Sequence, residues 1–350
     1  LDLAGTGPGT VTLKANDNDV NFTFGSVTAT GTGAKTLALG LGYSGNGDRE
    51  AMIFLGGISN SSDASPTSLT VSYGTGGNAN RYLSLVGNST FTGSISLTSF
   101  NGPGYLTIGG RRTRSTNDEG SGTLAGGSYP GDVALGAKTI LHFNSLAAQN
   151  MSGAISGAGS VDLDGSGTVT LSGLNTHSGN TIVQGGSALV LADNGGMTLY
   201  PANGGSSNKI TGGGSATING DFTIDTSAVT AVGGSWTLVD VASKSFGGTF
   251  TVAGAGWMET ADVWTNVVGA STWTFTEATG MLTLSTKAVF TSFAVTPGSA
   301  GGINNSANTI QLYVPVGTDL ATLAPTFTLS SGACDQTSGV VPTPNFSGGP

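Results

Sequence analysis

The stretch GSGTVTLSGLNTHSGNTIVQGGSALVL, residues 165–191, decides the fold of this 350-residue chain. It contains two short runs rich in Val, Ile, Leu and Thr, TVTLSG (168–173) and NTIVQGG (180–186), and each is bounded by Gly, Asn or Ser. Apolar residues that alternate with polar ones are typical of β-strands, and Gly, Asn and Ser are typical turn residues. The stretch therefore predicts short strands joined by tight turns.

Runs of the same kind recur along the chain at intervals of roughly 8 to 14 residues, which is the spacing of an all-β array. They include TVTLKA (10–15), KTLALG (35–40), SLTVSY (68–73) and KTILHF (138–143). The tetrapeptide GAKT occurs twice, at 33–36 and 136–139, as expected when one structural unit is stacked many times. With 60 glycines and only 9% charged residues, the composition argues against a helical protein. We therefore predict an all-β fold, a parallel β-solenoid with roughly 20 to 25 residues per coil.

The inward positions of such a solenoid would stack Val, Ile and Leu into one continuous column, with coils about 4.8 Å apart. In the stretch above we expect this column to contain Val169, Leu171, Ile182 and Val183.

The stretch 165–191 also resembles the autotransporter-associated β-strand repeat of large bacterial surface proteins. The positions that fall on this pattern are Gly167, Val169, Leu171, Gly173, Asn175, Gly179, Thr181, Val183, Gly186 and Leu189, and His177 stands where the family usually has Tyr. The resemblance is specific over 138–285 and only compositional over 1–137. It implies a right-handed parallel β-helix over residues 1–285, on a cell surface or secreted from one, and it brings no catalytic motif.

The last part of the chain has a different character. AVFTSFAVTPG (288–298) is followed by NTIQLYVPVGTDLATLAPTFTLSSGA (308–333). These runs resemble small Ig-like modules of bacterial surface proteins, which normally continue with one or two further strands. We therefore predict that 286–350 forms a small β-sandwich that lacks its final strands, either because the parent chain continues beyond Pro350 or because another segment completes it.

A sandwich that lacks strands leaves an apolar groove open to strand addition from another chain. The segment LDLAGTGPGTVTLKA (1–15) is a candidate donor, since its apolar residues alternate with polar ones, and it opens without Met, as a processed terminus would. Head-to-tail joining of this kind builds an open homopolymer. The residues assigned to this assembly are Leu1, Leu3, Val11 and Leu13 on the donor and Phe293, Val295, Leu312 and Val314 on the acceptor.

The charge balance excludes several classes of partner. The net charge is −9, and Lys and Arg together number 11, too few for a phosphate-binding footprint or for attraction to an anionic membrane. No apolar run approaches the roughly 20 residues that span a bilayer. The only cysteine, Cys334, excludes an intrachain disulfide. We expect no nucleic acid, no membrane insertion and an extracellular location on a bacterial surface.

Residues that could carry catalysis are few. Candidates for polysaccharide cleavage are two carboxylates on one strand face and an arginine cluster followed by acidic residues: Asp162, Asp164, Arg111, Arg112, Arg114, Asp118 and Glu119. Carboxylates two residues apart on a strand lie about 6.5 to 7 Å apart at the backbone, which suits glycoside hydrolysis. We interpret the cluster instead as a solvated corner insertion whose charges pair with one another. Of the two histidines, His142 is expected to face outward from its strand and His177 to occupy a corner.

Metal and ligand sites are weakly indicated. Asp17 and Asp19 offer oxygen ligands for Ca²⁺ in a predicted turn, but the run lacks the rest of a calcium loop, so we expect no cofactor. Four tryptophans fall close together in the sequence: Trp236, Trp257, Trp264 and Trp273. We expect Trp236 and Trp273 to plug the core near the end of the solenoid, with stacking on a glycan as the alternative.

Three functions follow, in order of preference. The first is a non-enzymatic extracellular structural protein, a subunit of a self-assembling fibre, filament or layer. The second is an adhesin that binds glycans or the surfaces of host or neighbouring cells. The third is a polysaccharide-degrading enzyme on a β-helix.

Overall fold

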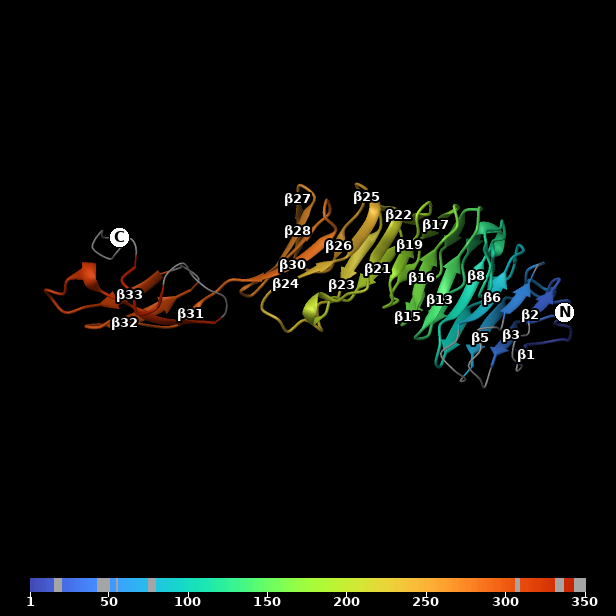
Figure 1. Ribbon diagram of the computed structural model, residues 1–350, viewed down its shortest axis with the longest axis horizontal. Coiled ribbons are helices and arrows are strands. Elements are labelled where there is room, and N and C mark those ends of the chain that lie inside the picture. The colour runs from blue at the N-terminus through green and yellow to red at the C-terminus, as the bar shows by residue number, and fades with distance from the viewer. Residues whose placement is uncertain are drawn as a thin grey trace. The chain divides into compact units, whose positions relative to one another are not determined.

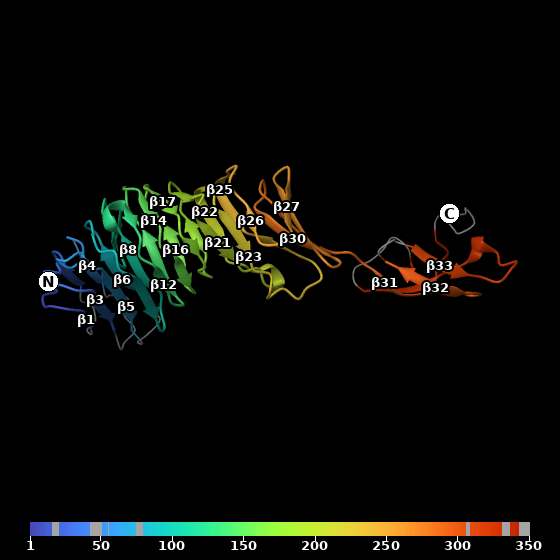
Figure 2. The same cartoon turned by 180° about the vertical axis from the view of Figure 1, so that it is seen from behind.

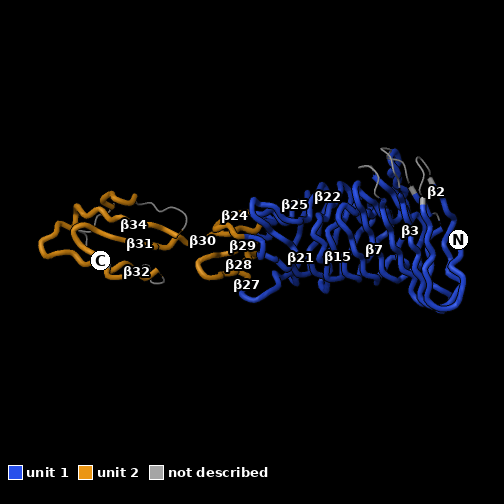
Figure 3. The backbone as a smooth tube through the Cα atoms, turned by 90° about the horizontal axis from the view of Figure 1, so that it is seen from below, with its two compact units in different colours: residues 1–229, 236–257, 276–281 blue, residues 230–235, 258–275, 282–350 orange. Residues whose placement is uncertain are grey.

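The computed structural model describes residues 1–15, 21–42, 51–54, 56–74, 80–305, 309–330 and 337–342. These residues are rich in β-strands, mostly in parallel sheets, and contain no α-helix; their helices are three-residue 3₁₀ turns, none of which could cross a bilayer. The chain divides into two compact units (Figure 3). Unit 1 comprises Leu1–Val229, Trp236–Trp257 and Thr276–Met281, and unit 2 comprises Thr230–Ser235, Met258–Phe275 and Leu282–Pro350.

Unit 1 is built on three parallel sheets. The first has the order β1 (Gly9–Ala15), β3 (Lys35–Leu41), β5 (Thr67–Tyr73), β7 (Ile95–Ser99), β12 (Val133–Leu135) and β15 (Ile155–Gly157). Each strand pairs in parallel with the next one in this order.

The second sheet runs beside the first (Figures 1 and 2). Its first part has the order β2 (Asn21–Phe24), β4 (Ala51–Phe54), β6 (Arg81–Leu85), β8 (Gly104–Ile108), β13 (Thr139–Phe143), β16 (Ser160–Leu163), β19 (Thr181–Val183) and β22 (Ile210–Ile218). From β22 it continues through β20 (Ala188–Leu191), β17 (Thr168–Leu171), β14 (Gln149–Met151) and β11 (Ser128–Tyr129), while β25 (Val239–Phe246) also pairs with β22. From β1 to β8 the chain alternates strictly between the two sheets.

Shorter elements complete unit 1. The third sheet contains β18 (Leu174–Asn175), β21 (Gly196–Leu199), β23 (Asp221–Ile224) and β26 (Val252–Ala253). An antiparallel hairpin is formed by β9 (Arg111–Arg112) and β10 (Asn117–Asp118), and the 3₁₀ turns are η1 (Ala125–Gly127) and η2 (Asn203–Gly205).

The sequence separation of paired strands changes along unit 1. In its later part Thr168 pairs with Ala188 and Val161 with Thr181, a separation of 20 residues that lies within the predicted 20 to 25. Near its start Lys35 pairs with Thr67, 32 residues later. The predicted 20 to 25 residues are therefore too few for this early part.

The core consists of the inward-facing residues of stacked strands. Along β3 buried and half-buried residues alternate without exception, and Val169 and Leu171 in β17 are buried as predicted. The assignment of Ile182 to the core is wrong. In β19 Thr181 and Val183 are buried and Ile182 lies half-exposed between them, because neighbouring residues of a strand point to opposite faces.

Glycines at one corner of unit 1 lie directly above one another. A Cβ atom on Gly173 would approach the carbonyl oxygen of Gly153 to 2.3 Å, one on Gly153 would approach that of Gly131 to 2.2 Å, and one on Gly131 would approach that of Gly93 to 2.2 Å. Real Cβ atoms do not come this close to backbone atoms. Glycine is therefore required in this column by the close approach of successive coils.

Unit 2 contains most residues of one sheet and two antiparallel strand pairs. A five-stranded sheet has the order β24 (Gly234–Thr237), β30 (Met281–Thr286), β29 (Ser271–Thr276), β28 (Val263–Val268) and β27 (Trp257–Thr260). Beyond it lie two antiparallel pairs, β31 (Phe290–Ala294) with β34 (Thr326–Leu329) and β32 (Ser299–Asn304) with β33 (Thr309–Tyr313), and the turn η3 (Leu320–Thr322).

Candidate functional site

The most elaborate polar cluster in unit 1 lies under the β9–β10 hairpin, residues 111–118. This hairpin interrupts the coil between β8 and η1 and lies on the outward face of β6. The Arg112 backbone N–H donates to Ser84 Oγ at 3.0 Å, and Ser84 Oγ–H donates to the Arg112 carbonyl oxygen at 3.2 Å. The hairpin thus covers residues of the second sheet that would otherwise face solvent.

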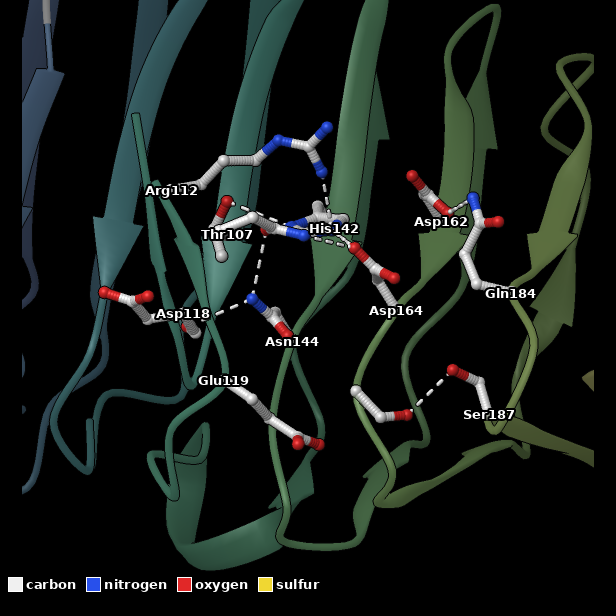
Figure 4. Close-up of polar contacts among 12 residues, drawn as sticks. Thr107, Arg112, Asp118, Glu119, His142, Asn144, Asp162, Asp164, Gln184 and Ser187 are labelled. Carbon is white, nitrogen blue, oxygen red and sulfur yellow. Dashed lines mark hydrogen bonds and ion pairs between the residues drawn. The ribbon is translucent and has the colours of Figure 1, made fainter. Parts of the chain in front are cut away.

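His142 is the centre of this cluster (Figure 4). It faces outward from β13, in register with Thr107 on β8 and Asp162 on β16. Arg112 Nη1 lies 2.6 Å from His142 Nε2, and Thr107 Oγ1 lies 3.2 Å from His142 Nδ1. Since Arg has only donors, Nε2 accepts this hydrogen bond and the proton of a neutral ring is on Nδ1. The predicted outward orientation is confirmed, but the side chain is completely buried because Arg112 covers it.

The surroundings of His142 keep its ring neutral, although the nearby carboxylates of Asp162 and Asp164 favour the protonated form. Burial is the main reason that the pKa of His142 is lowered, and the nearby Arg112 guanidinium lowers it further. Asp164 Oδ2 lies 3.4 Å from His142 Nε2 and accepts a hydrogen bond from Asn117 Nδ2 at 2.6 Å. A hydrogen bond from the protonated His142 ring, followed by the one from Asn117, lowers the pKa of Asp164 to about 2.

The two carboxylates that the sequence placed on one strand face have different partners. Asp162 Oδ1 accepts from Gln184 Nε2 at 3.0 Å, whereas Asp164 follows the end of β16 and is directed toward His142 (Figure 4). General acid–base catalysis requires groups that reach a substrate. His142 is enclosed and both carboxylates already have hydrogen-bond partners, so the geometry favours anchorage of the hairpin over catalysis.

The other members of the predicted arginine cluster lie at the surface. Arg111 and Arg114 are exposed, as expected for a solvated insertion. Asp118 and Glu119 are also exposed, but their contacts differ from the expected pairing with arginine. The Asp118 carbonyl oxygen accepts from Asn144 Nδ2 at 3.1 Å, and a Glu119 carboxylate oxygen accepts from the Ser166 backbone N–H. Arg112 departs from the expectation because it contacts His142.

Two tyrosines that the sequence interpretation did not single out adjoin this cluster. Tyr82 on β6 and Tyr105 on β8 are stacked, with ring centroids 5.3 Å apart, and the Arg112 guanidinium lies 4.3 Å above the centre of the Tyr105 ring. Burial raises the pKa of Tyr105. Their signal in the sequence is the matching position that each holds in RYLSLVG (81–87) and YLTIGG (105–110), one residue ahead of an inward leucine.

The predicted donor segment is part of unit 1. Residues 9–15 pair along the whole of β3, and the Leu3 backbone N–H donates to the Thr28 carbonyl oxygen at 2.7 Å. Leu3 is buried and Leu1 exposed, while Val11 and Leu13 are half-exposed. Donation of this segment to another chain would require these hydrogen bonds to break.

The predicted acceptor residues lie in a thinly packed part of unit 2. Val295 is buried, whereas Phe293, Leu312 and Val314 are half-exposed. Phe290, Phe293 and Phe327 cluster there, with centroids 5.3 to 6.2 Å apart.

Of the four tryptophans, the two that were expected in the core are buried. Trp236 and Trp273 are buried, and Trp236 Nε1–H donates to the Ala202 carbonyl oxygen at 2.7 Å. Trp257 and Trp264 are half-exposed.

The remaining candidates are the predicted calcium ligands, the cysteine and His177. Asp17, Asp19 and Cys334 lie outside the described residues. Within the described ranges no group of three or more His, Cys, Asp or Glu side chains is placed to hold a metal ion. His177 is buried at its corner, with Nε2 at 2.9 Å from Thr181 Oγ1, and burial lowers its pKa to about 4.

Comparison with known proteins gives one match. Residues 290–347 match a family described as SGBP, N-terminal, a family of surface glycan-binding proteins associated with the cell surface. The match covers the antiparallel pairs β31–β34 and β32–β33, within the segment that the sequence indicated as a surface module. No curated protein and no solved structure matches the chain significantly.

Proposed function

We propose that this protein is a non-enzymatic, extracellular glycan-binding protein of a bacterial cell surface. The observation that carries the proposal is the match of residues 290–347 to the surface glycan-binding family. In this proposal the matched segment belongs to the surface-associated part of the protein, and the stacked sheets of unit 1 form a scaffold that presents outward-facing side chains to glycans.

The scaffold supports a finer proposal, that unit 1 is a right-handed parallel β-helix of the autotransporter-associated type. Its strands pair in parallel and in register, with a 20-residue period in the later part. Asn175, which falls on the repeat pattern, is buried at a corner: its Oδ1 accepts from the Ile155 backbone N–H at 3.1 Å, and its Nδ2 donates to the carbonyl oxygens of Gly173 and Gly196. An asparagine that links three successive coils in this way explains why a stacked repeat would keep it.

The net charge points to the class of glycan. At −9 the protein repels acidic polysaccharides, so long-range electrostatics favour neutral ones. We therefore expect the ligand to be a neutral oligosaccharide or polysaccharide.

Affinity electrophoresis of the full chain tests the proposal. Native gels would contain soluble starch, laminarin or xyloglucan as neutral polysaccharides and alginate or polygalacturonate as acidic ones. We expect at least one neutral polysaccharide to retard the protein and the acidic ones to leave its mobility unchanged. Bovine serum albumin, which is also acidic, serves as the non-binding control. Unchanged mobility in every gel would contradict the proposal.

A structural subunit of a fibre or layer is the second candidate, favoured by the partial exposure of Phe293, Leu312 and Val314. We place it second because residues 9–15 of the proposed donor are already paired within unit 1. A polysaccharide-degrading enzyme is third, since the cluster of acidic and arginine residues that could serve it encloses its histidine.

A further inference from the structure

We propose that the β9–β10 hairpin is a flap over a sugar-binding surface centred on Tyr105, and that protonation of His142 releases this flap. The inference rests on the proposed function, because the ligand class is the neutral glycan argued above. It adds a location on the molecule and a means of control.

The flap is held by polar contacts. Asn117 Nδ2 donates to Asp164 Oδ2 at 2.6 Å, Asn144 Nδ2 donates to Asn117 Oδ1 at 3.1 Å, and Arg112 contacts both His142 and the Tyr105 ring. The stack beneath has an apolar core that does not depend on these contacts. A change of charge can therefore release the flap while the stack stays folded.

His142 has two alternative partners. When the ring is neutral, Nε2 accepts from Arg112 at 2.6 Å. When it is protonated, both ring nitrogens donate, so Arg112 loses its acceptor and meets a like charge. Asp164 Oδ2, 3.4 Å from the same nitrogen, is then the available acceptor. Protonation therefore changes the hydrogen-bond partner of His142 Nε2 from Arg112 to Asp164.

The groups that face His142 set the pH of this exchange. They are Tyr105 and Thr107 from β8, Arg112 from β9, Asp162 from β16 and Asp164 just after it. The two carboxylates favour the protonated ring, whereas burial and Arg112 oppose it. Burial and Arg112 outweigh the two carboxylates, so protonation of His142 is disfavoured. We therefore expect the flap to open only at acidic pH, below the ordinary histidine pKa.

Release of Arg112 would uncover a surface suited to a sugar. The guanidinium now occupies the ring face of Tyr105, which Tyr82 extends. Asp162 on β16 is hydrogen-bonded to Gln184, which directly follows β19, and β13 with His142 separates β16 from β8 in the sheet. An aromatic face binds the apolar face of a pyranose ring, and a carboxylate–amide pair binds its hydroxyl groups. The combination is that of a neutral-sugar site, which Arg112 blocks while the flap is docked.

Hydrogen–deuterium exchange of the full chain tests the flap without any ligand. Exchange would be compared at about pH 7.5 and about pH 4.5, above and well below the ordinary histidine pKa, after correction for intrinsic rates. In the wild type we expect residues 111–119 to exchange at least about tenfold faster at the lower pH. The variant His142→Gln should lose this response, and a peptide covering β17 should be unaffected in both. Equal protection of 111–119 at the two pH values in the wild type would overturn the flap.

Binding measurements test the sugar surface with the polysaccharide that retards the protein most. At neutral pH we expect Arg112→Ala to bind several-fold more tightly than the wild type, Tyr105→Ala to lose binding at both pH values, and Arg114→Ala, on the same hairpin but exposed, to match the wild type. If all three variants bind as the wild type does, the sugar surface lies elsewhere and the proposed function survives. If neither the wild type nor any variant binds any polysaccharide, the proposed function fails, and the sugar assignment fails with it.

Discussion

At the scale of single residues, the inner face of β17 requires apolar side chains, whereas its outer face accepts polar ones. Val169 is 3% exposed and points into the core, whereas Thr170 is half-exposed on the outer face. Val169→Asp would bury an unpaired carboxylate and lower the free energy of unfolding by several kcal/mol. Thr170→Asp should change it by about 0.5 kcal/mol or less. Thermal or urea unfolding of the two variants measures the difference, and equal shifts would contradict the face assignment.

A second prediction concerns the buried His177. Its pKa is about 4 in the folded protein and 6.5 in the unfolded chain, so between these values the unfolded state binds more protons. Stability should therefore be fully present above about pH 6.5 and fall by a few kcal/mol as the pH drops to about 4.

Urea unfolding across this pH range checks the prediction with His177→Gln as the comparison. The variant should lose most of the pH dependence and retain only the share due to His142, whose pKa is also lowered. An identical pH profile in the wild type and the variant would show that His177 is not the source.

The alternation of apolar and polar residues within a strand predicts the burial of some residues correctly and of others wrongly. The alternation in TVTL identified Val169 and Leu171 as core residues, while Ile182 was misassigned because it and Val183 cannot both point inward. His142 was correctly expected to face outward. Its burial depends on Arg112, 30 residues earlier in the chain, and no local pattern reports a contact of that kind.

At the scale of elements, the stacked glycines let neighbouring turns of the chain approach closely at one corner. They are Gly93, Gly131, Gly153 and Gly173. In Gly173→Ala the new Cβ would meet the Gly153 carbonyl oxygen at 2.3 Å, so neighbouring coils would have to separate, at a cost of about 1–3 kcal/mol. Gly185→Ala is a matched control, because the nearest atom to its Cβ would be 3.9 Å away. Comparison of the two unfolding midpoints tests the column, and an equally mild effect of both substitutions would contradict it.

Residues 1–15, the segment predicted to be a donor, allow a similar test. Leu3 is 1% exposed and Leu1 46% exposed. If residues 1–15 belong to unit 1, Leu3→Asp should lower the unfolding midpoint markedly and Leu1→Asp should leave it nearly unchanged. A segment that is free to leave for another chain would make both substitutions equally silent in a monomer.

The hairpin is the element that the sequence predicted least well. Its charges suggested an insertion at a corner, which is correct, but its docking depends on contacts such as that of Asn117 with Asp164, 47 residues apart. The coils are much more predictable, because each one repeats the contacts of the coil before it. An insertion occurs once, so its partners have no such periodicity.

At the scale of the whole molecule, the proposed function rests on the negative net charge and on the family match of residues 290–347. The chain has 20 acidic and 11 basic residues, which favours neutral over acidic ligands in solution. Residues 290–347 supply the link to surface glycan binding. The parallel stack supplies a rigid surface, but its regular strands do not by themselves specify a ligand.

A glycan microarray probed with the full chain is the most direct test of the central claim. The account predicts saturable binding to a defined set of neutral glycans, and no binding to uronic-acid or sulfated glycans. The heat-denatured chain, at the same concentration, is the control. A natively folded chain that binds no glycan above this control, or that binds only acidic ones, would contradict the claim that this is a surface protein for neutral glycans.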